Sequence, residues 1–167
     1  MPNDVYEADI VIWSEQQADL LRRAAQGERV NGLDWPNLIE EIESVGRSQI
    51  NAVESLLQQA LLHLLKCAGW PDCNAARHWR VETMGFLDDA ARRVSPGMRQ
   101  RIDLAVLYRK ALRLAQAEWI DGSGPRDLPP VCPFTFDELL DDAMPLDQWI
   151  ARLGIARPEA SPEGDDA

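Results

Sequence analysis

The chain has 167 residues, of which 46% are hydrophobic and 27% are charged, and its formal net charge is -11. This length suits one ordinary domain with a buried core. The acidic balance repels phosphate groups, which argues against nonspecific binding to nucleic acid or to an anionic membrane surface. No stretch reaches the roughly 18 apolar residues that a membrane helix needs, and the N-terminus lacks the pattern of a signal peptide. We therefore expect a cytoplasmic protein with no membrane partner and with reduced cysteines.

The first predicted helical stretch covers residues 4–26, where apolar residues recur at helical spacing. It is either one helix or two helices that meet at a bend near Ser14. Asp34 is the predicted N-cap of the next helix, and Gly46 either ends that helix or kinks it into the following one. The apolar stripe that we expect this helix to bury consists of Leu38, Ile39, Ile42 and Val45.

Residues 48–68 carry the strongest helical pattern in the chain. Their apolar face covers well over half of the helix circumference, which predicts a central helix that is contacted on several sides. Gly69 and Pro71 are expected to end it. Two further helices are predicted, one over residues 74–94 and one from the Ser95-Pro96 start signal to about residue 120.

A loop rich in proline and glycine is predicted between residues 121 and 133. Thr135 with Glu138 predicts a capping box and a short helix, a last short helix could follow near residue 150, and residues 154–167 are expected to be an acidic, disordered tail. No alternating strand pattern occurs. The expected fold is all-α, with a single up-and-down bundle of four main helices over residues 1–153 and the short C-terminal helices packed on its end.

Five blocks of the sequence occur in a familiar order between about Tyr6 and Pro145. They are YEADIVIWSEQQADLLR, LDWPNLIEEIESVGRS, LLHLLK, HWR and CPFTFDELL. Together they resemble the bacterial domain-of-unknown-function family number twenty-nine, and the combination LDW…EEIE…G…HLLK is the specific part. The resemblance implies a compact all-α domain and supplies no activity, because the role of that family is unassigned. The chain departs from the family pattern at Cys67, where an aromatic is usual, and at His78, where a serine is usual.

Two histidines and two cysteines lie within sixteen positions, in HLLKCAGWPDCNAARH. His63 and Cys67 share a helix face at i and i+4, whereas Cys73 lies in the turn and His78 in the next helix. A zinc site with these four ligands could bridge the hairpin, but five residues between the cysteines exceed the usual two to four. We favour a helical hairpin with a buried cysteine and two half-buried histidines, and we expect no bound metal or cofactor.

Glu40, Glu43 and His63 are the candidate catalytic residues. The two glutamates share a face at i and i+3, and an antiparallel neighbouring helix could place His63 beside them. Carboxylates and an imidazole are the parts of a small metal-dependent hydrolase. In the structural alternative, Glu43 pairs with Arg47, Glu40 or Glu41 meets an arginine of the 77–80 turn, and the imidazole of His63 forms a hydrogen bond inside the bundle.

The segment from Arg77 to Arg113 contains nine basic residues and four acidic ones, a local excess of five. Such a segment could bind nucleic acid through phosphate contacts. The alternative is that these arginines pair with acidic residues near the C-terminus, in the same chain or in a second copy. The candidate partners are Asp137, Glu138, Asp141, Asp142 and Asp147. We favour this second interpretation and expect no nucleic-acid partner.

The sequence contains no phosphate-binding glycine loop and no nucleophile elbow. Six tryptophans are expected to be mainly core residues, with Trp119 and Trp149 as the two that could belong to a dimer or partner surface. The sequence as a whole favours a non-enzymatic helical protein-interaction module over an enzyme. Its expected partner is an unidentified protein or a second copy of the chain.

Overall fold

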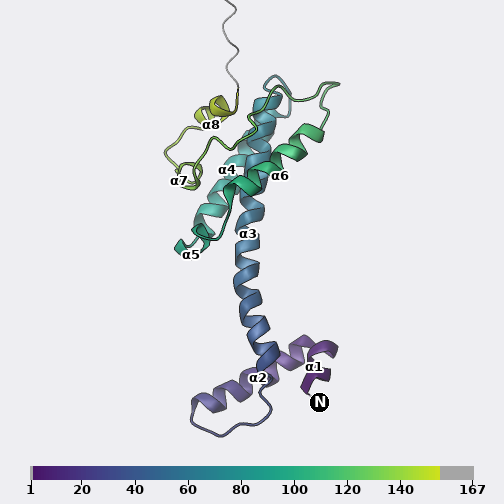
Figure 1. Ribbon diagram of the computed structural model, residues 1–167, viewed down its shortest axis with the longest axis vertical. Coiled ribbons are helices and arrows are strands. Elements are labelled where there is room, and N and C mark those ends of the chain that lie inside the picture. The colour runs from purple at the N-terminus through teal and green to yellow at the C-terminus, as the bar shows by residue number, and fades with distance from the viewer. Residues whose placement is uncertain (1, 155–167) are drawn as a thin grey trace, which may run out of the picture. The chain divides into compact units, whose positions relative to one another are not determined.

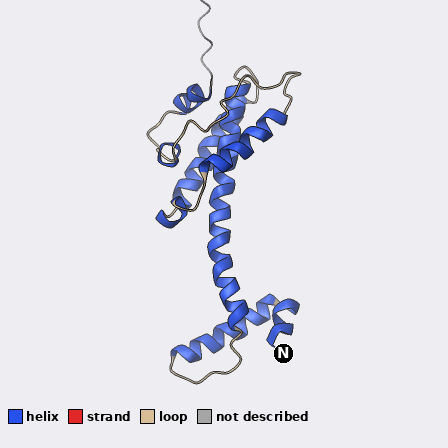
Figure 2. Cartoon of the chain, viewed as in Figure 1, coloured by secondary structure: helices blue, strands red, loops and turns tan. Residues whose placement is uncertain are grey.

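The computed structural model describes residues 2–154 of the chain. Every regular element in this range is a helix (Figure 2), which confirms the all-α prediction. The helices are α1 (Pro2–Ala8), α2 (Ile10–Ala25), α3 (Trp35–Gly69), α4 (Ala76–Arg93), α5 (Pro96–Arg99), α6 (Leu104–Ala117), α7 (Phe136–Leu139) and α8 (Leu146–Leu153) (Figure 1). Between residues 2 and 154, none of them combines the length and the hydropathy that a bilayer-spanning helix requires. The acidic tail predicted from residue 154 lies, beyond that residue, outside the described range.

The chain divides into two compact units, Met1–Gln49 and Ile50–Ala167, where the sequence analysis expected a single domain. Helix α3 contributes to both, because it continues through Gly46 without a break. Our expectation of a helix end or kink there was wrong. A single glycine inside a helix costs only about 1 kcal/mol, which good helix formers such as Glu43 and Arg47 on either side can outweigh. The four longest helices are present, with α2 in the first unit, and their exact arrangement as one four-helix bundle is not confirmed.

In the first unit, the chain bends at Asp9 and not near Ser14. The Asp9 side chain accepts hydrogen bonds from the backbone N–H groups of Val11 and Ile12, both at 3.0 Å, and so caps α2. The Ser14 hydroxyl lies inside α2 and donates to the carbonyl oxygen of Val11 at 2.8 Å. The hydroxyl of Ser14 thus bonds to the backbone within the helix, and Ser14 does not act as an N-cap.

Asp34 joins α2 to the start of α3, in the capping role predicted for it. One of its carboxylate oxygens faces the Asn37 backbone N–H at 3.5 Å, and the other accepts from the Asn37 side chain at 2.7 Å and from Trp13 Nε1 at 3.2 Å. The Asp34 backbone N–H donates to the Gln17 side chain at 2.9 Å. These donors favour the ionised form, and the hydrogen bond from Asn37 contributes most to lowering the pKa of Asp34.

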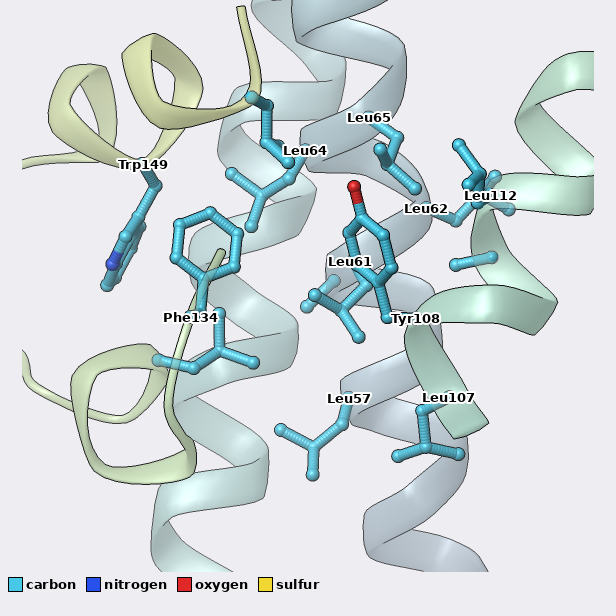
Figure 3. Close-up of a cluster of buried hydrophobic side chains, with 14 of the residues drawn as sticks. Leu57, Leu61, Leu62, Leu64, Leu65, Leu107, Tyr108, Leu112, Phe134 and Trp149 are labelled. Carbon is cyan, nitrogen blue, oxygen red and sulfur yellow. The ribbon is translucent and has the colours of Figure 1, made fainter. Parts of the chain in front are cut away.

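The core of the second unit is built by the later part of α3 together with α4 and α6 (Figure 3). Leu57 and Leu61 of α3 are fully buried, and the ring of Tyr108 on α6 points toward Leu61. Each such leucine stabilises the fold by about 1.5–3 kcal/mol relative to an exposed one. The segment after Pro133 covers the rest of this core. Its most buried side chains are Phe134, Leu139, Trp149 and Leu153.

The helix expected from Pro96 to about residue 120 is divided into α5 and α6. Asp103 starts α6, because its side chain accepts the backbone N–H of Val106 at 3.1 Å. The predicted capping box of α7 is confirmed: the Thr135 hydroxyl and the Glu138 carboxylate each accept from the other residue's backbone N–H, at 3.2 and 2.9 Å.

Candidate functional site

The hairpin between α3 and α4 brings both histidines of the chain to one carboxylate. Nδ1 of His63 lies 3.2 Å from one oxygen of Glu82, and Nε2 of His78 lies 3.2 Å from the other. His63 belongs to α3, whereas His78 and Glu82 are one helical turn apart on α4. We call these three residues the His63–Glu82–His78 cluster. Their side chains differ in exposure, at 12% for His63, 35% for Glu82 and 71% for His78.

The surroundings of His63 disfavour the protonated form of its imidazole. Burial lowers the pKa of His63, and the nearby Glu82 carboxylate opposes this effect without reversing it. Although Nδ1 is within ion-pair distance of Glu82, it has no hydrogen-bond partner of acceptable geometry among the described residues. The imidazole ring packs edge-on against Phe86, with ring centroids 5.5 Å apart. Both histidines were predicted to be half-buried, but His63 is largely buried and His78 is exposed.

The two cysteines of the motif lie at an aromatic cluster beside this hairpin. Cys67 is buried with Trp70 and Trp79, and burial raises the pKa of its thiol to about 11. Its Sγ is 3.7 Å from the carbonyl oxygen of Ala76, and Sγ of Cys73 accepts a backbone N–H at 3.4 Å. A cysteine binds zinc as the thiolate, which this raised pKa disfavours for Cys67. In residues 2–154, no group of three or more histidine, cysteine or acidic side chains is arranged to hold a metal ion.

Glu40 and Glu43 belong to the first unit and His63 to the second, although all three lie on α3, with Glu43 and His63 twenty positions apart. The catalytic hypothesis needed an antiparallel neighbour, and the continuation of α3 through Gly46 removes it. Arg47 lies 2.5 Å from Glu40 and 3.4 Å from Glu43. The predicted pairing of Glu43 with Arg47 is thus confirmed, and the expected arginine of the 77–80 turn is not the partner of Glu40.

The basic segment finds part of its acidic partners within the chain, as predicted. Arg80 pairs with Asp147 at 2.5 Å, and Arg99 pairs with Asp137. Three basic residues of α6 form no ion pair within the described part of the chain and, together with Val106, line a shallow hollow of about 320 Å³. They are Arg109, Lys110 and Arg113.

A larger open hollow of about 400 Å³ lies between the start of the α3–α4 turn and residues 120–126. Two interactions join its lining residues. Arg126 forms an ion pair with Asp72 at 2.6 Å, and Trp70 Nε1 donates to the carbonyl oxygen of Ser123 at 3.1 Å. Neither His63 nor Glu82 lines this hollow. A molecule held there would therefore not contact the His63–Glu82–His78 cluster.

The family model of the domain of unknown function DUF29 matches residues 5–144. The chain belongs to this family. It is also similar to an α-helical protein of unknown function from Rhodospirillum rubrum, whose crystal structure aligns with a TM-score of 0.69 at 33% sequence identity, over 90% of this chain and 98% of the other. No curated protein matches it. The DUF29 assignment confirms the predicted resemblance and adds no activity.

One exposed apolar surface of this DUF29 chain is formed by residues that the sequence analysis placed in the core. At the start of α3, Leu38 is buried, but four large apolar side chains expose more than half of their surface. They are Trp35 at 57%, Ile39 at 54%, Ile42 at 71% and Val45 at 63%, and we call them the α3 apolar stripe. Our prediction of a buried stripe was wrong for Ile39, Ile42 and Val45. Helical periodicity identifies an apolar face, but it does not say which element covers that face.

The tryptophans of the DUF29 chain separate into four buried and two exposed residues. Trp119 is 75% exposed, consistent with its predicted place on a surface, whereas Trp149 is 2% exposed and holds α8 on the core. The expectation for Trp149 was therefore wrong. Trp35 was not singled out, although its spacing to Ile39 and Ile42 already put it on the same helix face.

Proposed function

We propose that this DUF29 protein is a non-enzymatic binding protein that docks an amphipathic helix of a partner protein on the α3 apolar stripe. The observation that carries the proposal is the exposure of Trp35, Ile39, Ile42 and Val45 on one helix. Single exposed apolar residues are ordinary on a protein surface. Four large ones on a single helix face form the kind of patch that marks an interaction site.

The spacing of the stripe suits a helical partner. Trp35, Ile39 and Ile42 follow one another at i, i+4 and i+7, the pattern with which one helix packs along another. Glu40 and Arg47 lie on the side of α3 opposite Ile42 and pair with each other. Tryptophan is enriched among the strongest contacts of protein interfaces.

The hydrolase alternative is less well supported, because its parts are distributed over the chain. Glu40 and Glu43 pair with Arg47, and the imidazole of His63 packs against Phe86 and does not line the larger hollow. A nucleic-acid interface is less well supported too, since Arg80 and Arg99 are engaged by acidic residues and the net charge is -11. Each alternative would need charged side chains that already form ion pairs within the chain.

The proposal can be tested by photo-crosslinking in the host organism. The photoreactive residue p-benzoylphenylalanine replaces Ile42 in one variant, and Val81 of α4, which is 67% exposed, in the control. We expect a covalent adduct with a protein from position 42 and none above background from position 81. Equal labelling at both positions, or no protein adduct at position 42, would contradict a binding role for the stripe.

A further inference from the structure

We infer that the acidic segment 155–167 of this chain docks on the basic side of α6 and covers it. This side consists of Arg109, Lys110 and Arg113 around Val106, and we call it the α6 basic face. The inference goes beyond the proposed function, because it concerns the second unit and a surface of opposite character to the α3 apolar stripe.

The α6 basic face carries three positive charges that the described residues do not balance. Val106, Arg109, Lys110 and Arg113 follow one another at i, i+3, i+4 and i+7, so they share one side of the helix. Helix α6 contains no aspartate or glutamate, and within residues 2–154 these three cations have no ion-pair partner. The shallow hollow of about 320 Å³ between them gives room for an anionic group. In a chain whose net charge is -11, an acidic segment is the natural complement of such a face.

The segment 155–167 supplies the opposite charge. Its acidic residues are Glu159, Glu163, Asp165 and Asp166, and its one basic residue is Arg157. A single exposed ion pair contributes little, so one carboxylate would not hold the segment in place. Several carboxylates can meet the three cations together, and their attachment to the same chain gives them an effective concentration in the millimolar range.

The segment is long enough to reach the α6 basic face. It follows Gly154, the C-cap of α8, and Leu153 of α8 and Leu107 of α6 belong to the same core cluster. An α-helix with its side chains is about 10–12 Å across, whereas an extended chain spans about 3.3 Å per residue. The acidic residues at positions 163–166 can therefore lie up to about 30–40 Å from Gly154, which is enough to pass around α6.

Zero-length carbodiimide crosslinking of the purified full-length chain tests the contact, because this reagent joins an amine to a carboxylate only where the two meet. The sequence contains two lysines, Lys66 and Lys110. The side chain of Lys66 is 14% exposed and pairs with Glu118 at 2.7 Å. We expect mass spectrometry to locate an amide between Lys110 and an acidic residue of the segment 155–167, in a monomeric product. Its yield should fall at least about tenfold between about 0.01 M and 1 M salt, because salt screens exposed charges.

A first variant separates docking from chance encounters of a tethered segment. Lys110→Arg combined with Arg77→Lys keeps every charge and moves the amine to an exposed position on α4. That position lies three residues before Arg80, which pairs with Asp147 of α8, so the segment passes within reach of it. A segment that docks on α6 should give at least about tenfold less amide at position 77 than at position 110, because proximity sets the yield.

A second pair of variants tests the role of charge. Arg109→Glu combined with Arg113→Glu keeps Lys110 but reverses the charges beside it, and the yield should fall at least about tenfold. Arg93→Glu combined with Arg101→Glu changes the net charge equally at exposed positions outside α6 and should leave the yield within about twofold. Circular dichroism should be unchanged in both, since all four arginines are exposed. Absence of the Lys110 amide, equal yields from positions 77 and 110, or a product that forms only between two chains would overturn the inference.

Discussion

Tyr108 donates its phenolic hydrogen to the carbonyl oxygen of Pro129 at 2.7 Å, which fixes the proline-rich loop to the centre of the core. The side chain is fully buried. Tyr108→Phe keeps the ring and leaves the carbonyl oxygen without this donor, so we expect a loss of about 1 kcal/mol in the free energy of unfolding. Urea denaturation measures it. Leu114→Ala on the exposed side of the same helix is the control and should cost less than about 0.5 kcal/mol; equal losses for the two variants would contradict the role of the hydrogen bond.

His63 predicts a specific pH dependence of stability. Burial lowers its pKa in the folded state below the unperturbed value of about 6.5. Between these two values the unfolded chain binds more protons, so this contribution to stability is complete above about pH 6.5 and is lost as the pH falls through the folded pKa. We expect the free energy of unfolding to decrease on acidification from pH 7.5 to 5.

A pair of variants isolates the contribution of His63 from that of other groups. His63→Gln should flatten the pH profile in this window, since the variant has no imidazole to protonate at the buried position. His78→Gln, at the exposed end of the His63–Glu82–His78 cluster, should retain the profile of the unchanged chain. The reverse result would place the pH response at His78 and refute the assignment.

Cys67 should be the least reactive thiol of the native protein. Its Sγ is buried beside Trp70 and Trp79, and its pKa is raised to about 11, so little thiolate exists near pH 8. Ellman's reagent at pH 8, followed by mass-spectrometric mapping, should modify Cys73 before Cys67, because Cys73 is only partly buried. All three thiols should react at similar rates once the chain is unfolded in guanidinium. Rapid modification of Cys67 in the folded protein would mean that the aromatic cluster opens readily.

The capping box of α7 sets the ionisation of Glu138. Its carboxylate accepts the backbone N–H of Thr135, the largest contribution, together with Arg152 at 2.8 Å, and these donors lower the pKa of Glu138 to about 2. Arg152→Gln removes the positive charge, so an NMR titration of the carboxyl carbon should show the pKa rising toward the usual value of about 4.3 without reaching it. Arg80→Gln, which removes a different ion pair, should leave the Glu138 titration unchanged. A Glu138 titration unaffected by Arg152→Gln would show that this pair does not form in solution.

The sequence predicted those parts of the fold that depend on neighbours in the chain. The caps at Asp34 and Thr135 and the pairing of Glu43 with Arg47 all join residues three or four positions apart, and such contacts follow from helix geometry. The continuation of α3 through Gly46 could not be predicted in the same way. A glycine is a weak breaker, and whether the helix continues depends on the balance of small energies along it.

The candidate site was predictable to a smaller extent. His78 and Glu82 are separated by four residues, so their contact could have been read from the spacing, whereas the approach of His63 to Glu82 depends on how α3 and α4 pack. The exposure of Ile42 has the same origin. The sequence shows that Ile42 is apolar, but its exposure depends on whether another helix packs against it. Such packing is a tertiary interaction that local sequence patterns do not contain.

The core of the second unit depends on side chains that the ribosome supplies after its three long helices. Leu139, Trp149 and Leu153 are at most 2% exposed, and they belong to helices of four and eight residues that are too short to persist alone. During translation, the apolar surface of α3, α4 and α6 therefore remains exposed to solvent until residues up to Leu153 have left the exit tunnel. Premature termination within this stretch should yield nascent chains that chaperones retain or proteases remove, so quality control would discard incomplete copies of this protein.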